Sequence, residues 1–124
     1  MRIGMIGLGA MGLPIAKRLL GAGHELCAFD LSPRAAGEAE AAGARICPTA
    51  GEAAADTEVL FCSLPNAAIV RSVLEEILGR ESIGASVIAD LSSIAPESAR
   101  KFSEMAAARG ITYMDCPVLS LIHI

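Results

Sequence analysis

The sequence predicts an α/β fold in which helices cover both faces of a doubly wound, mostly parallel β-sheet. Short apolar runs alternate with helical segments along the 124-residue chain, a pattern typical of β–α units joined by right-handed crossovers. The apolar run at residues 59–63 indicates a fourth strand, buried on both faces of a parallel sheet. A chain of this length is expected to form a single domain, to which we assign residues 1–118.

The first β–α–β unit is predicted within the first thirty residues. Residues 2–6 form an apolar strand, and the periodic apolar residues of the segment 11–20 predict a helix. Gly-Ala-Gly-His at residues 21–24 ends this helix, because glycine suits the position after the last turn. The apolar run at residues 25–30 is the second strand.

Capping residues define the next two helices. Ser32 is expected to cap a helix that has Pro33 in its first turn and runs through Ala42 to Gly43. Residues 44–47 form a brief third strand. Thr49-Ala50-Gly51-Glu52 has the spacing of a capping box, which predicts a short helix.

The second half of the chain repeats the alternation. Residues 67–78 place apolar side chains on one face of a predicted helix, and Pro96 opens another helix that runs to Arg109. The apolar runs at residues 86–91 and 111–115 are the fifth and sixth strands.

The first β–α turn carries a glycine pattern with a chemical use. It reads Gly7-Leu8-Gly9-Ala10-Met11-Gly12. Gly7 permits a tight turn, Gly9 lets the backbone approach a pyrophosphate, and Gly12 lets the helix pack closely on the strand. The N–H groups and positive dipole end of the helix would hold the phosphates. The pattern predicts a dinucleotide site; the alternative is a glycine-rich turn without a ligand.

Asp30 ends the second strand, 23 residues after Gly7. A carboxylate at this spacing is expected to accept hydrogen bonds from both ribose hydroxyls, and it would repel a 2′-phosphate, which favours NAD over NADP. Arg34 complicates this prediction, because its guanidinium could reach a 2′-phosphate or pair with Asp30 or a nearby Glu. A solvated Asp at a strand end is the remaining alternative.

Two further strand ends point to the same edge of the sheet. Leu64 and Pro65 follow the fourth strand and could line the ribose–nicotinamide side of the cofactor, while Asn66 is expected to cap the next helix. Ser92 and Ser93 follow the fifth strand. Their hydroxyls could contact the nicotinamide ribose or a substrate, or cap the helix that Pro96 begins.

Composition argues against several other classes of protein. The net charge is −4 with both signs interspersed, unlike a nucleic-acid-binding surface, and no apolar run is long enough for a membrane helix. Four widely spaced cysteines without a companion histidine cluster argue against a zinc site, so no metal ligand is assigned. We expect reduced cysteines, with Cys27 and Cys62 packed as small hydrophobes, and a cytoplasmic protein. His24 is interpreted as structural.

These residues resemble the N-terminal signature of the β-hydroxyacid dehydrogenases, with the 3-hydroxyisobutyrate dehydrogenases as the nearest type. Four motifs occur in the family's order across residues 1–118. They are the segment 7–16 followed by Ala22-Gly23-His24, Phe29-Asp30-Leu31-Ser32-Pro33, Leu64-Pro65, and Asp90-Leu91-Ser92-Ser93-Ile94-Ala95-Pro96.

The resemblance implies a Rossmann-type domain and a reaction. A nicotinamide cofactor takes a hydride from the carbinol carbon of a 3-hydroxy acid, giving a semialdehyde, and a lysine acts as general acid/base. The six residues of the glycine pattern would hold the pyrophosphate and Asp30 the adenine ribose. Leu64 and Pro65 would line the nicotinamide side, and Ser93 would replace a family threonine near nicotinamide. The full-length enzyme is expected to take a small hydroxy acid and to form a homo-oligomer.

The chain departs from the family pattern after Asp115-Cys116-Pro117-Val118. The Ser-Gly-Gly of a substrate loop is missing, and the family lysine and helical C-terminal domain would lie beyond residue 124. We therefore assign no catalytic residue, expect no dehydrogenase turnover from this chain, and expect an exposed apolar surface where a second domain would pack. Leu-Ser-Leu-Ile-His-Ile at residues 119–124 matches one reading frame of a common transposase sequencing adapter, which predicts a non-native tail.

Two other functions remain open at this point. A non-catalytic dinucleotide-binding module would need no lysine. The N-terminal domain of an NADP-dependent imine reductase-like enzyme shares the glycine signature, although Asp30 argues against it.

Overall fold

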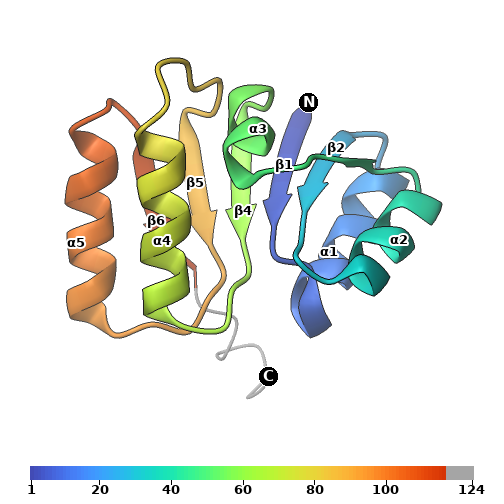
Figure 1. Ribbon diagram of the computed structural model, residues 1–124, viewed down its shortest axis with the longest axis horizontal. Helices are drawn as coiled ribbons and strands as arrows, with labels where there is room; N and C mark the ends of the chain where they lie inside the picture. Colours follow the sequence, from blue (N-terminus) through green and yellow to red (C-terminus); the bar gives the residue numbers. More distant parts are fainter. Residues whose placement is uncertain (117–124) are drawn as a thin grey trace.

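A computed structural model describes residues 1–116 of the chain, and these residues form one parallel sheet with helices on both faces (Figure 1). The strand order is β3-β2-β1-β4-β5-β6, and every neighbouring pair is parallel. The predicted doubly wound fold is therefore confirmed. The predicted boundary at residue 118 and the predicted tail at residues 119–124 lie outside the described residues.

The described residues contain six strands and five helices, as the alternating pattern predicts. The strands are β1 (Arg2–Ile6), β2 (Glu25–Phe29), β3 (Arg45–Ile46), β4 (Val59–Cys62), β5 (Val87–Asp90) and β6 (Thr112–Asp115). The helices are α1 (Gly9–Gly21), α2 (Pro33–Ala41), α3 (Ala50–Ala55), α4 (Ala67–Leu78) and α5 (Pro96–Ala107). The largest difference at a helix start is in α1, which begins at Gly9 inside the glycine pattern rather than at Met11. None of these helices is long and apolar enough to cross a membrane.

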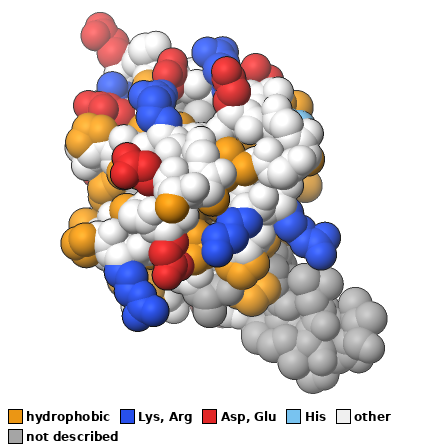
Figure 2. Space-filling view, turned by 90° about the vertical axis from the view of Figure 1, so that its right-hand side faces the viewer, with side chains coloured by type: hydrophobic (Ala, Val, Ile, Leu, Met, Phe, Trp, Pro, Cys, Tyr) orange, Lys and Arg blue, Asp and Glu red, His pale blue; other side chains and the backbone are white. Residues whose placement is uncertain are grey.

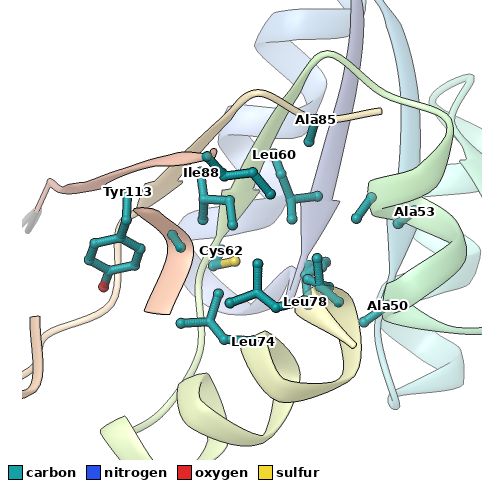
Figure 3. Packing of buried hydrophobic residues seen from close by; sticks show 14 of the residues in the cluster. Ala50, Ala53, Leu60, Cys62, Leu74, Leu78, Ala85, Ile88 and Tyr113 are labelled. Carbon is teal, nitrogen blue, oxygen red and sulfur yellow. The ribbon is translucent and has the colours of Figure 1, made fainter. Parts of the chain in front are cut away.

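Alternation along the strands divides the core into two clusters. On β1, Ile3 and Met5 face α1 and α2, whereas Ile6 faces the opposite cluster under α3, α4 and α5. The larger cluster also contains Leu60, Cys62, Leu74 and Ile88, which Figure 3 shows packed together with Tyr113. Burying both faces of β1 fixes the register of the strand that leads into the glycine pattern.

One half-face of the sheet has no helix packed on it among residues 1–116. On β4, β5 and β6 the side chains opposite α4 and α5 include Val59 and Val87, which are half-buried, and Met114, which is 48% exposed. These three residues belong to neither core cluster. The apolar side chains on this half-face agree with the sequence-based expectation of an exposed apolar surface.

The cysteine prediction is wrong for one pair. Cys27 and Cys47 are buried and joined by a disulfide, with their Cα atoms 6.3 Å apart. Cys27 pairs in register with Arg45 on the neighbouring strand, so Cys47, two residues further on, reaches the same face of the sheet. Cys62 and Cys116 are the free cysteines of the described residues.

Glu76 on α4 holds the first turn of α3, and its removal is expected to destabilise the domain. Its Oε2 accepts a hydrogen bond from the buried Gly51 N–H at 2.6 Å. Glu76→Ala leaves that donor unpaired, which we expect to lower the free energy of unfolding by about 1–3 kcal/mol. Urea unfolding followed by circular dichroism measures the effect. The control is Glu75→Ala on the same helix, because the side chain of Glu75 is exposed and pairs only loosely with Arg71. Equal losses in the two variants would contradict the prediction.

Candidate functional site at the carboxyl edge of the sheet

A cavity of about 280 Å³ lies at the carboxyl ends of the central strands. This is the edge where ligands bind in doubly wound sheets. Its lining brings together five residues singled out by the sequence from three separate strand ends, namely Gly7, Gly9, Asp30, Leu64 and Pro65. Phe29, Leu31, Ile69 and Val73 add apolar walls.

The backbone of the glycine pattern is shaped as the sequence predicts. Gly7 has a φ of +82°, and a Cβ there would lie 2.1 Å from the Ser63 carbonyl oxygen. A Cβ at Gly12 would lie 2.6 Å from the carbonyl oxygen of Gly7, so α1 packs directly on the turn. At Gly9 a Cβ would meet nothing within 4 Å. The turn is therefore crowded at Gly7 and Gly12 and open at Gly9.

The N-terminus of α1 keeps its N–H groups available. Its N-cap is the buried Leu8, which makes no side-chain capping hydrogen bond, and the first turn contains no acidic residue. In contrast, Ser32, Thr49 and Asn66 cap α2, α3 and α4 with their side chains, as predicted. Uncapped N–H groups beside an open glycine fit an anion such as a pyrophosphate.

Asp30 ties the end of β2 to the glycine pattern. Its Oδ2 accepts a hydrogen bond from Leu8 N–H at 2.6 Å, and its Oδ1 accepts one from Ser32 N–H at 2.7 Å. The carboxylate is therefore held by two backbone N–H groups rather than free in solvent. An ionised carboxylate has about four lone-pair sites, so both oxygens can still accept a ribose hydroxyl.

The structure does not support a contact between Arg34 and a 2′-phosphate. Its side chain is 90% exposed and pairs with Glu38, one helical turn on, at 3.7 Å. Of the alternatives left open by the sequence, the structure shows the pairing with a nearby Glu.

The loops after β4 and β5 contact each other through a side chain. Leu64 N–H donates a hydrogen bond to Ser92 Oγ at 2.8 Å, and Ser92 is 4% exposed. Ser93 is exposed and does not line the cavity. Of the alternatives left open for these hydroxyls, the structure does not show capping of α5, since the N-cap is Ala95 and makes no side-chain bond.

A buried polar group lies beneath these loops. Asp90 is fully buried and accepts hydrogen bonds from Ser92 N–H at 3.0 Å and from the Tyr113 hydroxyl. Burial, followed by the hydrogen bond to Asp90, raises the pKa of Tyr113. Burial and the charge of Asp90 also raise the pKa of the Cys62 thiol. The sequence signal for this group was a carboxylate at the end of the apolar fifth strand.

These two pKa shifts predict a loss of stability in alkali. The ordinary pKa values are 9.0 for the thiol and 10.0 for the phenol, and both are raised on folding. The folded chain therefore holds protons that the unfolded chain releases, so this contribution is complete below pH 9 and is lost as the pH rises further. Urea unfolding between pH 7 and 11 should show a falling midpoint, with a shallower fall in Tyr113→Phe. An equal pH dependence in both proteins would refute this account.

A larger cavity, of about 370 Å³, lies at the opposite edge beside the amino ends of β1 and β2. It contains Arg2, His24, Arg45 and Asp56. Arg45 and Asp56 are already paired at 2.6 Å. Helices α1 and α2 end at this edge, so neither presents its N-terminus to an anion there.

Charged side chains of both signs are interspersed on the side of the molecule that Figure 2 shows. We place the candidate site at the carboxyl edge.

The chain is similar to known proteins over nearly its whole length. Residues 2–120 match the family of the NAD-binding domain of 6-phosphogluconate dehydrogenase. The 2-(hydroxymethyl)glutarate dehydrogenase of Eubacterium barkeri is 43% identical over 94% of this chain and 40% of its own length.

Two solved structures are similar to the chain. The 3-hydroxyisobutyrate dehydrogenase of Mycobacterium tuberculosis superposes with a TM-score of 0.84 at 33% identity, over 90% of this chain and 38% of that one. The Streptomyces aurantiacus imine reductase has a TM-score of 0.79 at 30% identity, over 91% and 39%. The chain thus spans about 40% of the length of these relatives.

Proposed function

The chain belongs to the family of NAD-binding domains represented by that of 6-phosphogluconate dehydrogenase, and from this premise we propose that it is the NAD(H)-binding part of a 3-hydroxyacid dehydrogenase. The proposed reaction oxidises a 3-hydroxyisobutyrate-like acid to its semialdehyde by hydride transfer to NAD. The observation that carries the proposal is the open glycine turn at Gly9 beside the carboxylate of Asp30.

Each part of the site has a proposed role. The uncapped N–H groups in the first turn of α1, in the segment 9–11, bind the pyrophosphate, since Leu8 N–H is already bonded to Asp30. Asp30 accepts hydrogen bonds from the adenine ribose. Leu64 and Pro65 share a cavity with Asp30, which supports a contact with the adenosine half of the cofactor rather than the nicotinamide side. Ser93, after β5, remains the proposed residue near nicotinamide. When bound, the nicotinamide ring supplies the hydride acceptor.

Proton transfer is the part of the reaction for which we assign no residue. The two lysines of the sequence, Lys17 and Lys101, lie on α1 and α5 with exposed side chains, and neither lines the cavity. General acid–base catalysis requires a group within hydrogen-bond reach of the reacting atom. We therefore expect no turnover of 3-hydroxyisobutyrate with NAD by this chain, and formation of NADH well above the blank would contradict this.

Titration of the 124-residue chain with NADH and with NADPH, followed by nucleotide fluorescence, tests the proposal. Saturable binding that is tighter for NADH is the expected result. The similar imine reductase structure makes the N-terminal domain of an imine reductase-like enzyme the second candidate. We expect such an enzyme to prefer NADP, so tighter binding of NADPH would favour it. Absence of saturable binding of either nucleotide to the folded chain would overturn the proposal.

A further inference from the structure

Resting on the proposed binding of NAD(H), we infer that Ser92 and Asp90 are positioning residues that fix the Leu64–Pro65 wall of the cofactor cavity. Neither residue lines the cavity itself. Hydrogen bonds lead inward from this wall, through Ser92, to the buried carboxylate of Asp90.

The wall leaves the sheet at Leu64. One residue earlier, Ser63 N–H still donates to the Ile6 carbonyl at 2.9 Å, in continuation of the β1–β4 ladder. The N–H of Leu64 instead donates to the side-chain oxygen of Ser92 at 2.8 Å. This side-chain acceptor replaces a ladder bond at the point where the backbone turns into the cavity, so the position of Ser92 Oγ sets the position of Leu64.

Ser92 is in turn held by Asp90. The backbone N–H of Ser92 donates to Asp90 Oδ1 at 3.0 Å, and the hydroxyl of Tyr113 on β6 donates to Asp90 Oδ2. Asp90 is 0% exposed, and both of these partners are uncharged. Burying a carboxyl group without a cation is costly for folding. Each carboxylate oxygen of Asp90 accepts a hydrogen bond from one fixed donor, so the carboxylate has a single orientation. That orientation determines where Ser92 lies.

The wall also contacts the glycine pattern. Leu64 Cδ2 is 2.8 Å from the position that a Cβ would occupy at Gly7. A shift of Leu64 would therefore change both the apolar wall and the packing beside the pyrophosphate turn. Hydrogen bonds thus connect β6, β5 and β4 to the cavity in the order Tyr113, Asp90, Ser92 and Leu64.

Ser92→Ala tests the inference, because it removes the acceptor for Leu64 N–H and adds nothing. We expect the Kd for NADH to rise about fivefold to tenfold, which corresponds to the loss of one hydrogen bond. The titration is made under conditions where circular dichroism shows that the chain is folded. Ser92→Thr keeps the oxygen and is expected to recover most of the affinity. Tyr113→Phe removes a donor to Asp90 far from the cavity, and a smaller rise in the same direction is expected.

The control separates positioning from general destabilisation. Ile88→Val lies on the same strand, β5, in the core, and loosens packing without removing any hydrogen bond of this series. Its Kd is expected to match that of the unaltered chain. An unchanged Kd in Ser92→Ala, or an equal rise in Ile88→Val, would overturn this inference alone. Failure of the unaltered chain to bind NADH would overturn the proposed function as well.

Discussion

Replacing Gly9 by alanine is expected to weaken NADH binding by more than tenfold while the chain remains folded. A Cβ at this position meets no protein atom within 4 Å, so it projects into the open space assigned to the pyrophosphate. The positive φ of +41° adds a backbone cost of about 1 kcal/mol for a residue with a side chain. Isothermal titration with NADH measures the loss, and thermal unfolding measures the stability.

The chain contains a matched control for this variant. Gly21 lies at the other end of α1, also has nothing within 4 Å of a Cβ, and has no positive φ. Gly21→Ala is therefore expected to leave the affinity for NADH unchanged and to stabilise the helix slightly. Equal affinities in Gly9→Ala and Gly21→Ala would show that the glycine turn does not hold the cofactor.

Asp30→Asn is expected to lower the affinity for NADH about tenfold and to narrow the preference for NADH over NADPH. Hydrogen bonds to a charged group contribute about 1.5–3 kcal/mol each, and the amide presents one acceptor where the carboxylate presents two. Loss of the negative charge also removes the repulsion of a 2′-phosphate. Part of the effect will be indirect, because the same carboxylate accepts from Leu8 N–H in the glycine pattern.

Asp56→Asn makes the same chemical change at the opposite edge of the sheet. Asp56 pairs with Arg45 at an exposed position, where an ion pair contributes little to stability. The Kd values of the Asp56→Asn variant for NADH and NADPH are expected to equal those of the unaltered chain. A tenfold loss in Asp56→Asn would mean that net charge, rather than the position of Asp30, controls binding.

Local sequence patterns were enough to predict the strands, the helices and the shape of the glycine turn. Glycine spacing and a run of apolar residues depend on near neighbours, so the turn at Gly7 and Gly12 and the strand ending at Asp30 could be predicted. Three helix caps, at Ser32, Thr49 and Asn66, were predicted on the same basis. These features require no knowledge of which strands are neighbours.

The remaining features depend on contacts between distant segments. The bond from Leu8 to Asp30 joins residues 22 positions apart, and that from Leu64 to Ser92 joins residues 28 apart. Each follows from the pairing of β1 with β2 or of β4 with β5. The Cys27–Cys47 disulfide likewise needs the β2–β3 register. Local sequence patterns do not show which strands are neighbours, so these contacts could not be predicted from the sequence.

The most direct test of the account is a titration of the ¹⁵N-labelled chain with NADH, followed by amide chemical shifts. Saturable shift changes are expected at the carboxyl edge, in Leu8, Gly9, Ser32 and Leu64, with the amides of the opposite cavity unaffected. Changes confined to Arg2, His24 and Arg45, or no changes at millimolar NADH, would contradict it.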